Sequence, residues 1–237
     1  MNHKAKRCIP RRLWYRLLAW KMALSDGFGA ISYSQEGEDL ILRRVFEGRR
    51  SGFFVDVGAH HPSRFSNTYY FYKLGWSGIN IDATPGSMRL FRRRRPRDIN
   101  VEAAVGLPGE AVPFFLFEDP ALNTLNAATA QALGSGPYHK VGEQTLVKRS
   151  LAALLEQHLP AHQVIDFLTV DVEGADLEVL QSNNWRLFRP SWLLVEAIGL
   201  GVRAALEAEV NRYLSGAGYE LSAKTLNTLI FRRLDHA

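Results

Sequence analysis

Apolar residues along the chain fall into short continuous runs that alternate with segments of helical periodicity. A run of this length is typical of a strand that is buried on both faces of a sheet. The runs predict five strands, at residues 52–57, 77–82, 99–105, 167–171 and 192–196. Helical periodicity predicts helices at residues 34–46, 66–74, 87–95, 151–159 and 202–214, and one that begins at residue 177.

The order of these elements predicts an α/β fold. Strands that alternate with helices form a mostly parallel sheet with helices on both faces. Two further strands, 219–223 and 226–232, follow each other without a helix and predict an antiparallel hairpin at one edge. Two short strands, 112–117 and 145–148, flank a polar segment over 119–142 that we interpret as a loop.

Size and composition favour one globular domain. The chain has 237 residues, 46% of them hydrophobic, which is enough for one sizeable core. We expect a single domain over residues 32–237, preceded by an N-terminal extension at residues 1–31. The lone cysteine, Cys8, excludes an intramolecular disulfide framework and a thiolate zinc site, and it suits a cytoplasmic protein.

The N-terminal extension is strongly basic. Residues 1–25 hold seven of the 29 Lys and Arg residues and no acid, and the other 22 bases face 24 acids, a formal charge of −2 for the rest of the chain. Residues 13–20 combine tryptophan and leucine with Arg16, which predicts a basic amphipathic helix too short and too charged to span a bilayer. Two interpretations stay open: peripheral contact with the inner face of a membrane or with a partner, and packing against the chain's own domain.

Three of the predicted strands end in an acidic residue: Asp56, Asp82 and Asp171. In an open parallel sheet, ligands bind at the carboxyl ends of the strands. Asp82 follows the Asp56-Val57-Gly58 turn at about the spacing that separates a nucleotide-binding turn from the acid that holds the ribose. The chain contains neither a G-x-G-x-x-G turn nor a G-x-x-x-x-G-K-[ST] loop, which disfavours dinucleotides and nucleoside triphosphates.

Several motifs occur in order between residues 32 and 232: Ser34–Asp39, Phe54–Ala59, Ser66–Thr68, Gly75–Gly78, Phe167–Asp176 and Arg189–Glu196. Together they resemble the FkbM family of methyltransferases. The resemblance implies a class I, Rossmann-like methyltransferase fold with a seven-stranded, mostly parallel sheet and an antiparallel last strand. It also implies S-adenosylmethionine as the cofactor and, in most members, a hydroxyl oxygen as the methyl acceptor.

The same resemblance implies which residues hold the cofactor. Asp56, Gly58 and Ala59 would face its methionine part, and Asp82, with Ala83 beside it, would hold its ribose. Where the family usually has an acid–proline pair, this chain reads Asp82-Ala83-Thr84-Pro85, which shifts the following turn. The other implied contacts are Glu102 and Ala103 at the adenine, Ser66 and Asn67 at the start of a helix that receives the carboxylate, and Gln35 across the cofactor. Ser66 and Asn67 have a second interpretation as simple helix caps.

Methyl transfer to a hydroxyl requires help with the acceptor's proton. Asp171 lies where acceptors approach in this fold, and we expect it to act as a base or to orient the acceptor, with Glu173 as a second carboxylate in the same turn. Alternatively, Asp171 and Glu173 bind Mg²⁺ through their oxygens. His60 and His61 are further candidate bases, since histidine titrates near neutrality; adjacent side chains diverge, so only one of the two faces the site.

We therefore expect an O-methyltransferase that acts on a carbohydrate or glycoconjugate hydroxyl, for example on a deoxysugar of a bacterial glycan or signalling oligosaccharide. The alternatives are O-methylation of a polyketide-type metabolite and a non-catalytic module with this cofactor fold. The run Arg92-Arg93-Arg94-Arg95 raises a nucleic-acid hypothesis, but four consecutive arginines spread around a helix, and we interpret them as a solvated face. Asn123 and Thr124 are candidate acceptor contacts, and no oligomeric state follows from the sequence.

Overall fold

The computed structural model describes residues 10–25, 29–109 and 111–234, with residues 21–25 described by their backbone alone. The chain divides into two units, Met1–Ser32 and Tyr33–Ala237. In the first unit, α1 (Arg11–Ser25) is a helix of 15 residues. The rest of the predicted extension, residues 1–9 with Cys8 and residues 26–28, lies outside the described residues. Among the described residues, no helix is long and apolar enough to cross a membrane.

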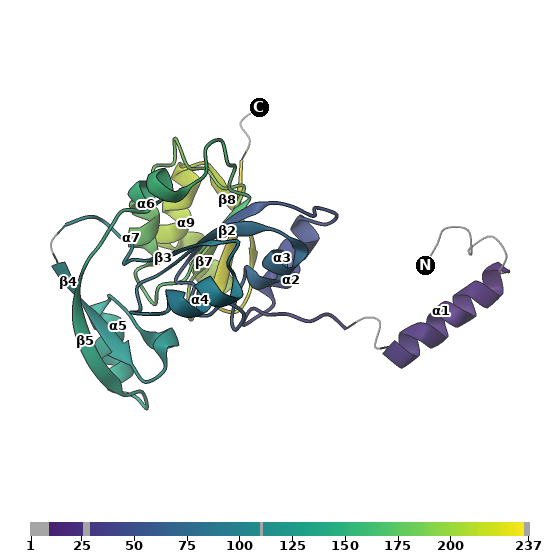
Figure 1. The fold of residues 1–237 in the computed structure, drawn as a ribbon, viewed down its shortest axis with the longest axis horizontal. Coiled ribbons are helices and arrows are strands. Elements are labelled where there is room, and N and C mark those ends of the chain that lie inside the picture. The colour runs from purple at the N-terminus through teal and green to yellow at the C-terminus, as the bar shows by residue number, and fades with distance from the viewer. Residues whose placement is uncertain (1–9, 26–28, 110, 235–237) are drawn as a thin grey trace. The chain divides into compact units, whose positions relative to one another are not determined.

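The second unit is built on a seven-stranded sheet with the strand order β3-β2-β1-β6-β7-β9-β8 (Figure 1). Neighbouring strands are parallel from β3 to β7, and β9 runs antiparallel between β7 and β8. This arrangement confirms the predicted fold class. The strands are β1 (Phe53–Val57), β2 (Ser77–Asp82), β3 (Ile99–Glu102), β6 (Phe167–Val170), β7 (Trp192–Glu196), β8 (Tyr219–Lys224) and β9 (Thr228–Arg233).

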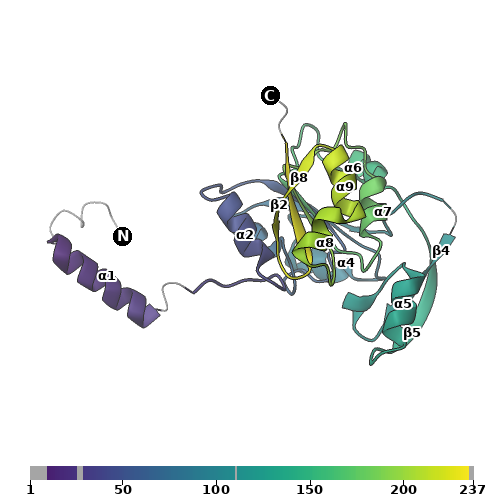
Figure 2. The same cartoon turned by 180° about the vertical axis from the view of Figure 1, so that it is seen from behind.

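Helices cover both faces of the sheet (Figures 1 and 2). Because successive strand residues point to opposite faces, Val55 of β1 packs into the cluster under α6 and α7, whereas Phe54 packs against α2 and α3. The helices of the first face are α6 (Leu151–His158), α7 (Asp176–Gln181), α8 (Val202–Glu207) and α9 (Glu209–Gly216). Those of the other face are α2 (Glu38–Val45), α3 (Tyr69–Leu74) and α4 (Met88–Arg94).

Three predicted helices differ from the structure by more than one residue at an end or by a break, and the one expected over 66–74 begins at Tyr69. The helix expected from residue 34 begins at Glu38, because Gly37 before it has φ 86°; Ser34 lies outside the helix, where its hydroxyl donates to Asp39 Oδ1 and accepts the Asp39 N–H. The helix expected over 202–214 is two helices, because Ala208 between them is extended at φ −63° and ψ 147°. Hydrophobic periodicity persists across such a break, so it does not reveal the break.

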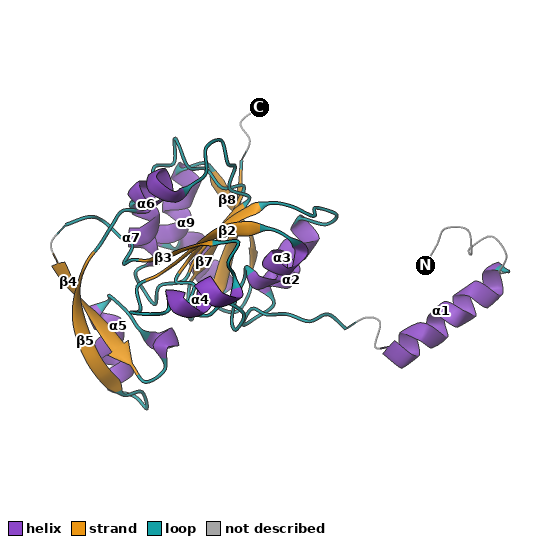
Figure 3. Ribbon diagram, viewed as in Figure 1, coloured by secondary structure: helices purple, strands orange, loops and turns teal. Residues whose placement is uncertain are grey.

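Residues 111–147 form an arm with a sheet of its own (Figure 3). Its strands β4 (Ala111–Phe117) and β5 (Lys140–Val147) are antiparallel, and a 3-10 turn (Pro120–Leu122) and helix α5 (Ala127–Gly134) lie between them in the chain. The interpretation of 119–142 as a loop was therefore wrong. Asn126 starts α5, since its side chain accepts hydrogen bonds from the N–H groups of Ala128 and Thr129.

Arg95 is the exception in the run of four arginines. Arg92, Arg93 and Arg94 are exposed on α4, whereas the exposed fraction of Arg95 is 0%. Its Nε donates to Asp98 Oδ2 at 2.7 Å and its Nη1 donates to Thr68 Oγ1 at 3.0 Å. The interpretation of the run as a solvated face was wrong for Arg95, because the carboxylate of Asp98, three residues later, gives it a buried partner.

Candidate active site

A pocket opens at the carboxyl ends of β1, β2, β3 and β6, where an open parallel sheet binds its ligands. It encloses about 510 Å³, including space open to solvent, which suits a small-molecule site. The sheet supplies one side of the lining and the arm supplies the other, with Phe114, Pro120, Ala121, Asn123 and Leu125. The lining on the sheet side includes Gly58, His60, Asp82, Ala83, Ala103, Val105, Asp171 and Glu173.

Gly58 connects the two halves of this site. Its φ of 83° favours glycine, and a Cβ atom added there would lie 1.6 Å from the backbone oxygen of Asp171. The Gly58 N–H donates to Ile81 O, and the Asp171 N–H donates to Val57 O. The turn after β1 therefore packs directly on the turn after β6, which brings the predicted cofactor residues and the predicted catalytic residues together.

Asp82 is fixed in the pocket wall by two backbone groups. Its Oδ2 accepts the N–H of His60 at 2.9 Å, and its Oδ1 accepts the N–H of Thr84 at 2.7 Å. A carboxylate oxygen has more than one acceptor site, so both oxygens can still receive hydrogen bonds from a ligand. This geometry fits the predicted role of Asp82 as the acceptor for two ribose hydroxyls.

The structure places four of the ten predicted cofactor residues in the pocket lining: Gly58, Asp82, Ala83 and Ala103. Six predicted residues are not in this lining: Gln35, Asp56, Ala59, Ser66, Asn67 and Glu102. Gln35 is exposed, and Glu102 accepts the N–H of Gly86 on the outer side of β3. Contact between these six residues and the cofactor stays a prediction.

Asp56, Ser66 and Asn67 have partners within the protein. The Thr68 hydroxyl donates to Asp56 Oδ2 at 2.8 Å, and burial raises the pKa of Asp56 to about 6 although the nearby Arg95 lowers it. Ser66 Oγ accepts the N–H groups of Thr68 and Tyr69, and Asn67 Nδ2 donates to Thr169 Oγ1. Ser66 thus behaves as a cap at the start of α3.

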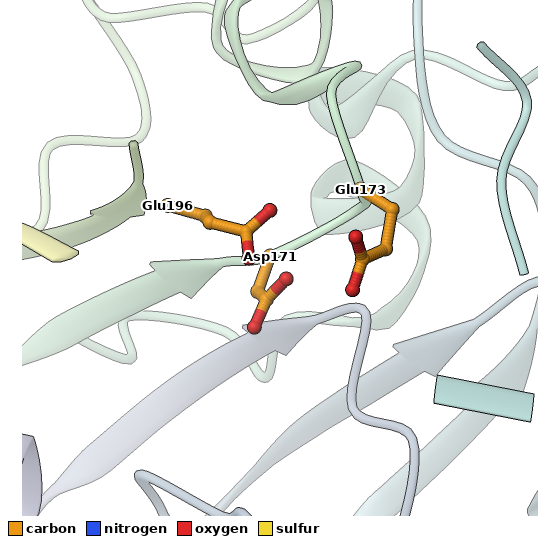
Figure 4. Close-up of side chains that lie close together, drawn as sticks. All are labelled: Asp171, Glu173 and Glu196. Atoms are coloured by element: carbon orange, nitrogen blue, oxygen red, sulfur yellow. The ribbon is translucent and has the colours of Figure 1, made fainter. Parts of the chain in front are cut away.

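Three carboxylates lie close together beside the turn that follows β1. Oxygens of Asp171, Glu173 and Glu196 all lie within 4.8 Å of one another. Figure 4 shows Asp171 between the other two, with Glu196 reaching in from the end of β7 and Glu173 from the turn after β6. Glu173 has φ 55°, a conformation that residues other than glycine rarely adopt, so the surrounding turn holds its carboxylate in place.

Crowding and burial keep protons on these acids near neutral pH. Burial, with a smaller effect from Asp176, raises the pKa of Glu173 to about 7. Burial and the neighbouring carboxylates raise the pKa of Asp171 and of Glu196, and a hydrogen bond joins the two side chains. One proton shared between Asp171 and Glu196 explains how two carboxyl groups can lie this close.

His60, and not His61, lines the pocket. His61 Nδ1 accepts the backbone N–H groups of Ser63 and Arg64 at 3.1 and 2.9 Å, so the turn occupies this ring nitrogen. Burial is the main cause that lowers the pKa of both histidines, and the neutral ring is favoured in each. As predicted, the two side chains diverge, and the catalytic role of His61 stays a prediction.

Glu196 is the member of the site that the sequence reasoning missed. It ends a predicted buried strand in the same way as Asp82 and Asp171 end theirs, and in register it pairs with Thr228 of β9. An acidic residue at the carboxyl end of a predicted buried strand is a candidate site residue, and Glu196 meets this criterion at the end of the strand predicted over 192–196. Its position also explains why the segment around Glu36 and Glu38 lies near the site, since Thr228 Oγ1 donates to Glu38 Oε1.

Two side chains of the arm, Thr124 and Asn126, donate hydrogen bonds to the turn after β6 (residues 171–174), which we call the acidic turn. Thr124, with an exposed fraction of 1%, donates its hydroxyl to Glu173 O at 2.8 Å and accepts the N–H of Asn126 at 2.9 Å. Asn126 Nδ2 donates to Gly174 O at 2.9 Å. On the cofactor side, Asn123 Nδ2 donates to Thr84 Oγ1 at 3.1 Å. Residues 123–126 therefore bridge the pocket from the Asp82 turn to the acidic turn.

The Thr124→Val substitution tests this fastening. Valine keeps the shape of threonine but leaves Glu173 O and the Asn126 N–H without their partner, so we expect the free energy of unfolding to fall by about 1–3 kcal/mol. Urea denaturation measures the change. Thr145→Val, an exposed position on β5 of the same arm, is the matched control and should change little. Equal effects of the two substitutions would contradict the proposed role of Thr124.

The pocket residues fit an adenosine-containing cofactor. Asp82 offers carboxylate oxygens for ribose hydroxyls, and Ala83 and Ala103 leave room beside it. Val105, Phe114 and Leu125 supply apolar surface for a planar base. The acids on the β6 side lie at the opposite end of the lining, where a reacting group would meet a candidate base.

Comparison with known proteins gives one family match and similarity to solved structures. The family model described as "Methyltransferase FkbM domain" matches residues 56–221. No curated protein sequence matches the chain at a significant level. Among solved structures, the chain is similar to a TehB-like SAM-dependent methyltransferase from Corynebacterium glutamicum, with 12% identity, a TM-score of 0.43, and 94% of this chain and 100% of that chain covered. It is also similar to a proposed O-methyltransferase from Klebsiella pneumoniae, with 10% identity, a TM-score of 0.41, and coverage of 88% and 84%.

The solved structures at these TM-scores say nothing about the activity of this chain. The family match assigns a methyltransferase domain to this chain, because it spans more than half of the chain. The matched region contains Asp56 and the acidic residues from Asp171 to Glu196. The predicted resemblance is thereby confirmed, and the chain belongs to the FkbM methyltransferase domain family.

Proposed function

We propose that this S-adenosylmethionine-dependent methyltransferase methylates a hydroxyl oxygen of a carbohydrate or glycoconjugate. The observation that carries the proposal is the cluster of Asp171, Glu173 and Glu196 beside the cofactor pocket. An amine that is already neutral needs no base to attack a methyl group, whereas an alcohol is a weak nucleophile until its proton leaves. Carboxylates with raised pKa values are suited to accept that proton.

Held in the pocket by residues such as Asp82, S-adenosylmethionine would supply a methyl group on a sulfonium sulfur, and that sulfur would leave with the electron pair of the C–S bond as a neutral thioether. The acceptor oxygen forms the new O–C bond and gives its proton to the carboxylate of Asp171. Glu196, through its hydrogen bond to Asp171, holds that side chain in orientation. Ionised Glu173 raises the pKa of Asp171 and so makes it a stronger base. Residues 123–126 hold the turn that carries Glu173.

Polar groups next to Glu196 favour a polyhydroxyl acceptor over an apolar one. Glu36 accepts hydrogen bonds from the backbone and side-chain amides of Asn227, and Glu38 accepts the hydroxyls of Thr225 and Thr228. Thr228 pairs with Glu196, so this hydrogen-bonded group lies at the end of β7. An apolar, polyketide-type acceptor would gain little from these polar neighbours, because apolar surface needs apolar partners.

The pH dependence of the rate should follow the acids of the cluster. A protonated carboxyl group cannot take the acceptor's proton, and burial together with the neighbouring carboxylates raises the pKa of Asp171, so we expect kcat/KM to rise with pH through an apparent pKa well above that of an ordinary aspartate. Glu173→Gln should move this rise to lower pH, because an ionised Glu173 raises the pKa of Asp171. Measurement of kcat/KM from pH 5 to pH 9 for the wild-type protein and for Glu173→Gln tests this expectation. A wild-type profile that falls with pH, or one that Glu173→Gln leaves unchanged, would contradict this assignment.

The acceptor class is tested with methyl-labelled cofactor and two sets of acceptors, glycan extracts and polyketide-type alcohols. We expect label in the carbohydrate fraction as a methyl ether, which resists mild alkali. Label that alkali releases as methanol would reveal a methyl ester, and label on nitrogen would exclude O-methylation. Label in the polyketide-type alcohols alone would favour that alternative.

Mg²⁺ bound by Asp171, Glu173 and Glu196 is the alternative to a direct base, since carboxylate oxygens are its preferred ligands. The two assignments differ in what they require: a direct base uses the carboxylate of Asp171 itself, whereas a metal site would use oxygens of all three acids as ligands. Full activity in excess EDTA is expected. Loss of activity in EDTA, with recovery on addition of Mg²⁺, would support the metal.

A further inference from the structure

Helix α1, taken by itself, carries an apolar stripe along one side. Leu13, Leu17 and Trp20 lie at positions i, i+4 and i+7 and so share one side of the helix. Their exposed fractions are 49%, 51% and 70%. Tyr15 and Leu18 are exposed as well, so the apolar area of the helix exceeds the stripe. An exposed apolar surface of this kind marks a site of interaction.

Positive charge adjoins the stripe. Arg12 and Arg16, also one helical turn apart, lie beside it around the helix, and both are exposed. Residues 1–25 contain seven bases and no acid, whereas the remainder of the chain has a formal charge of −2. The net positive charge is therefore confined to the N-terminal 25 residues, and charge complementarity favours an anionic partner for α1.

We propose that α1 binds an anionic lipid surface and lies flat on it. Leucine and tryptophan enter the boundary between headgroups and acyl chains, and arginines contact the lipid phosphates. A nucleic acid would match the charge but would leave the leucine stripe in water. A second copy of α1 would match the stripe but would bring like charges together. Lipid is the occupant that satisfies both the stripe and the charge, and its binding places the Tyr33–Ala237 unit at a membrane.

The test is co-sedimentation of the full chain with vesicles of phosphatidylcholine alone or mixed in equal parts with phosphatidylglycerol. We expect binding to the mixed vesicles only. The double variant Leu17→Ser/Trp20→Ser, which removes the stripe, and Arg12→Glu/Arg16→Glu, which reverses two charges, should each weaken binding by about tenfold or more. Arg92→Glu/Arg93→Glu on α4 is the matched control, because it reverses two exposed charges outside α1 and should weaken binding far less.

Affinity for S-adenosylhomocysteine, measured on the same samples, shows that each variant retains a folded catalytic unit. Three results would overturn the proposal. The first is no sedimentation with either kind of vesicle. The second is equal loss of binding in the α4 control, which would assign the attraction to general surface charge. The third is retention of a short duplex DNA, or self-association in light scattering, that depends on α1 while vesicle binding does not.

Discussion

Replacing Asp171 with asparagine is expected to lower kcat for methyl transfer by about 10²- to 10⁴-fold, the range for the loss of a positioned general base. Asparagine has nearly the shape of aspartate but cannot accept the acceptor's proton. Asp171 faces the cofactor pocket without being one of the predicted cofactor ligands, so the affinity for S-adenosylhomocysteine should not change. Single-turnover rates with labelled cofactor measure the first quantity, and calorimetry measures the second.

The same substitution should stabilise the protein at alkaline pH. Burial and the adjacent carboxylates raise the pKa of Asp171, so the folded protein holds a proton that the unfolded chain releases above about pH 4. The stability of the wild-type protein therefore falls as pH rises from that value toward the folded-state pKa. Asparagine carries no such penalty, and its melting temperature should exceed the wild-type value by more at pH 8 than at pH 5.

Asp119→Asn is the control for both effects, since Asp119 is an exposed carboxylate on the arm, its ion pair with Arg64 is 3.7 Å long, and asparagine keeps the oxygen that accepts the Ala121 N–H. This control should keep its kcat and its melting temperature. Asp171→Asn with unchanged kcat would exclude Asp171 as the base. A lower melting temperature at pH 8 would contradict the destabilising carboxylate cluster.

Replacing Arg95 with methionine is expected to lower the free energy of unfolding by about 3–5 kcal/mol, the cost of removing one partner of a buried ion pair. Arg95 and Asp98 are both buried, and methionine would leave the Asp98 carboxylate with only the N–H of Gly78 and the amide of Asn80. Thr68 would also lose the donor from Arg95 Nη1, although its own hydroxyl still donates to Asp56. Urea denaturation measures the loss.

Two further variants make this result specific. Arg94→Met changes an exposed arginine on the same helix and should have little effect. Arg95→Met/Asp98→Asn should recover part of the loss, because the second substitution removes the uncompensated charge. If Arg95→Met costs no more than Arg94→Met, the buried pair contributes nothing to stability.

The positions of Asp82 and Asp171 could be predicted because buried parallel strands have a clear signature. Their apolar runs end abruptly, and the carboxyl ends of such strands meet at one edge of the sheet. Glu196 obeys the same rule and was missed because the count of strand-end acids stopped at three strands. The ends of the predicted buried strands therefore indicate Glu196 as well as Asp171, whereas the family motifs alone did not assign Glu196 to the site.

Only part of the arm could be predicted from the sequence: the strands expected over 112–117 and 145–148 correspond to β4 and to the end of β5, whereas the segment between them was interpreted as a loop. Strand β5 is mostly exposed along its length, so no alternation of apolar and polar residues marks it. Helix α5 is short. It is stabilised by the Asn126 cap, a local contact, and by the hydrogen bond from Asn126 to Gly174, a tertiary contact. Hydrophobic periodicity does not register such contacts, and a polar segment with glycine was therefore interpreted as a loop.

Arg95 shows a second limit of sequence patterns. Four consecutive arginines predict a solvated surface when each is judged alone. Asp98 follows after Pro96, and the chain reversal there brings its carboxylate to the guanidinium inside the protein. The burial of Arg95 depends on that pairing, and no periodicity in the sequence distinguishes it from Arg92, Arg93 and Arg94.

Titration of the chain with S-adenosylhomocysteine by calorimetry, with and without Asp82→Ala, tests most directly that this pocket holds the methyl donor. We expect one site per wild-type chain. The substitution removes a charged acceptor for two hydroxyls, so affinity should fall on the order of 100-fold or more, since hydrogen bonds to charged groups contribute about 1.5–3 kcal/mol each. Thermal unfolding of the variant checks that the turn around His60 and Thr84 persists. No binding by the wild-type chain, or equal binding by the folded Asp82→Ala variant, would contradict the assignment of the pocket.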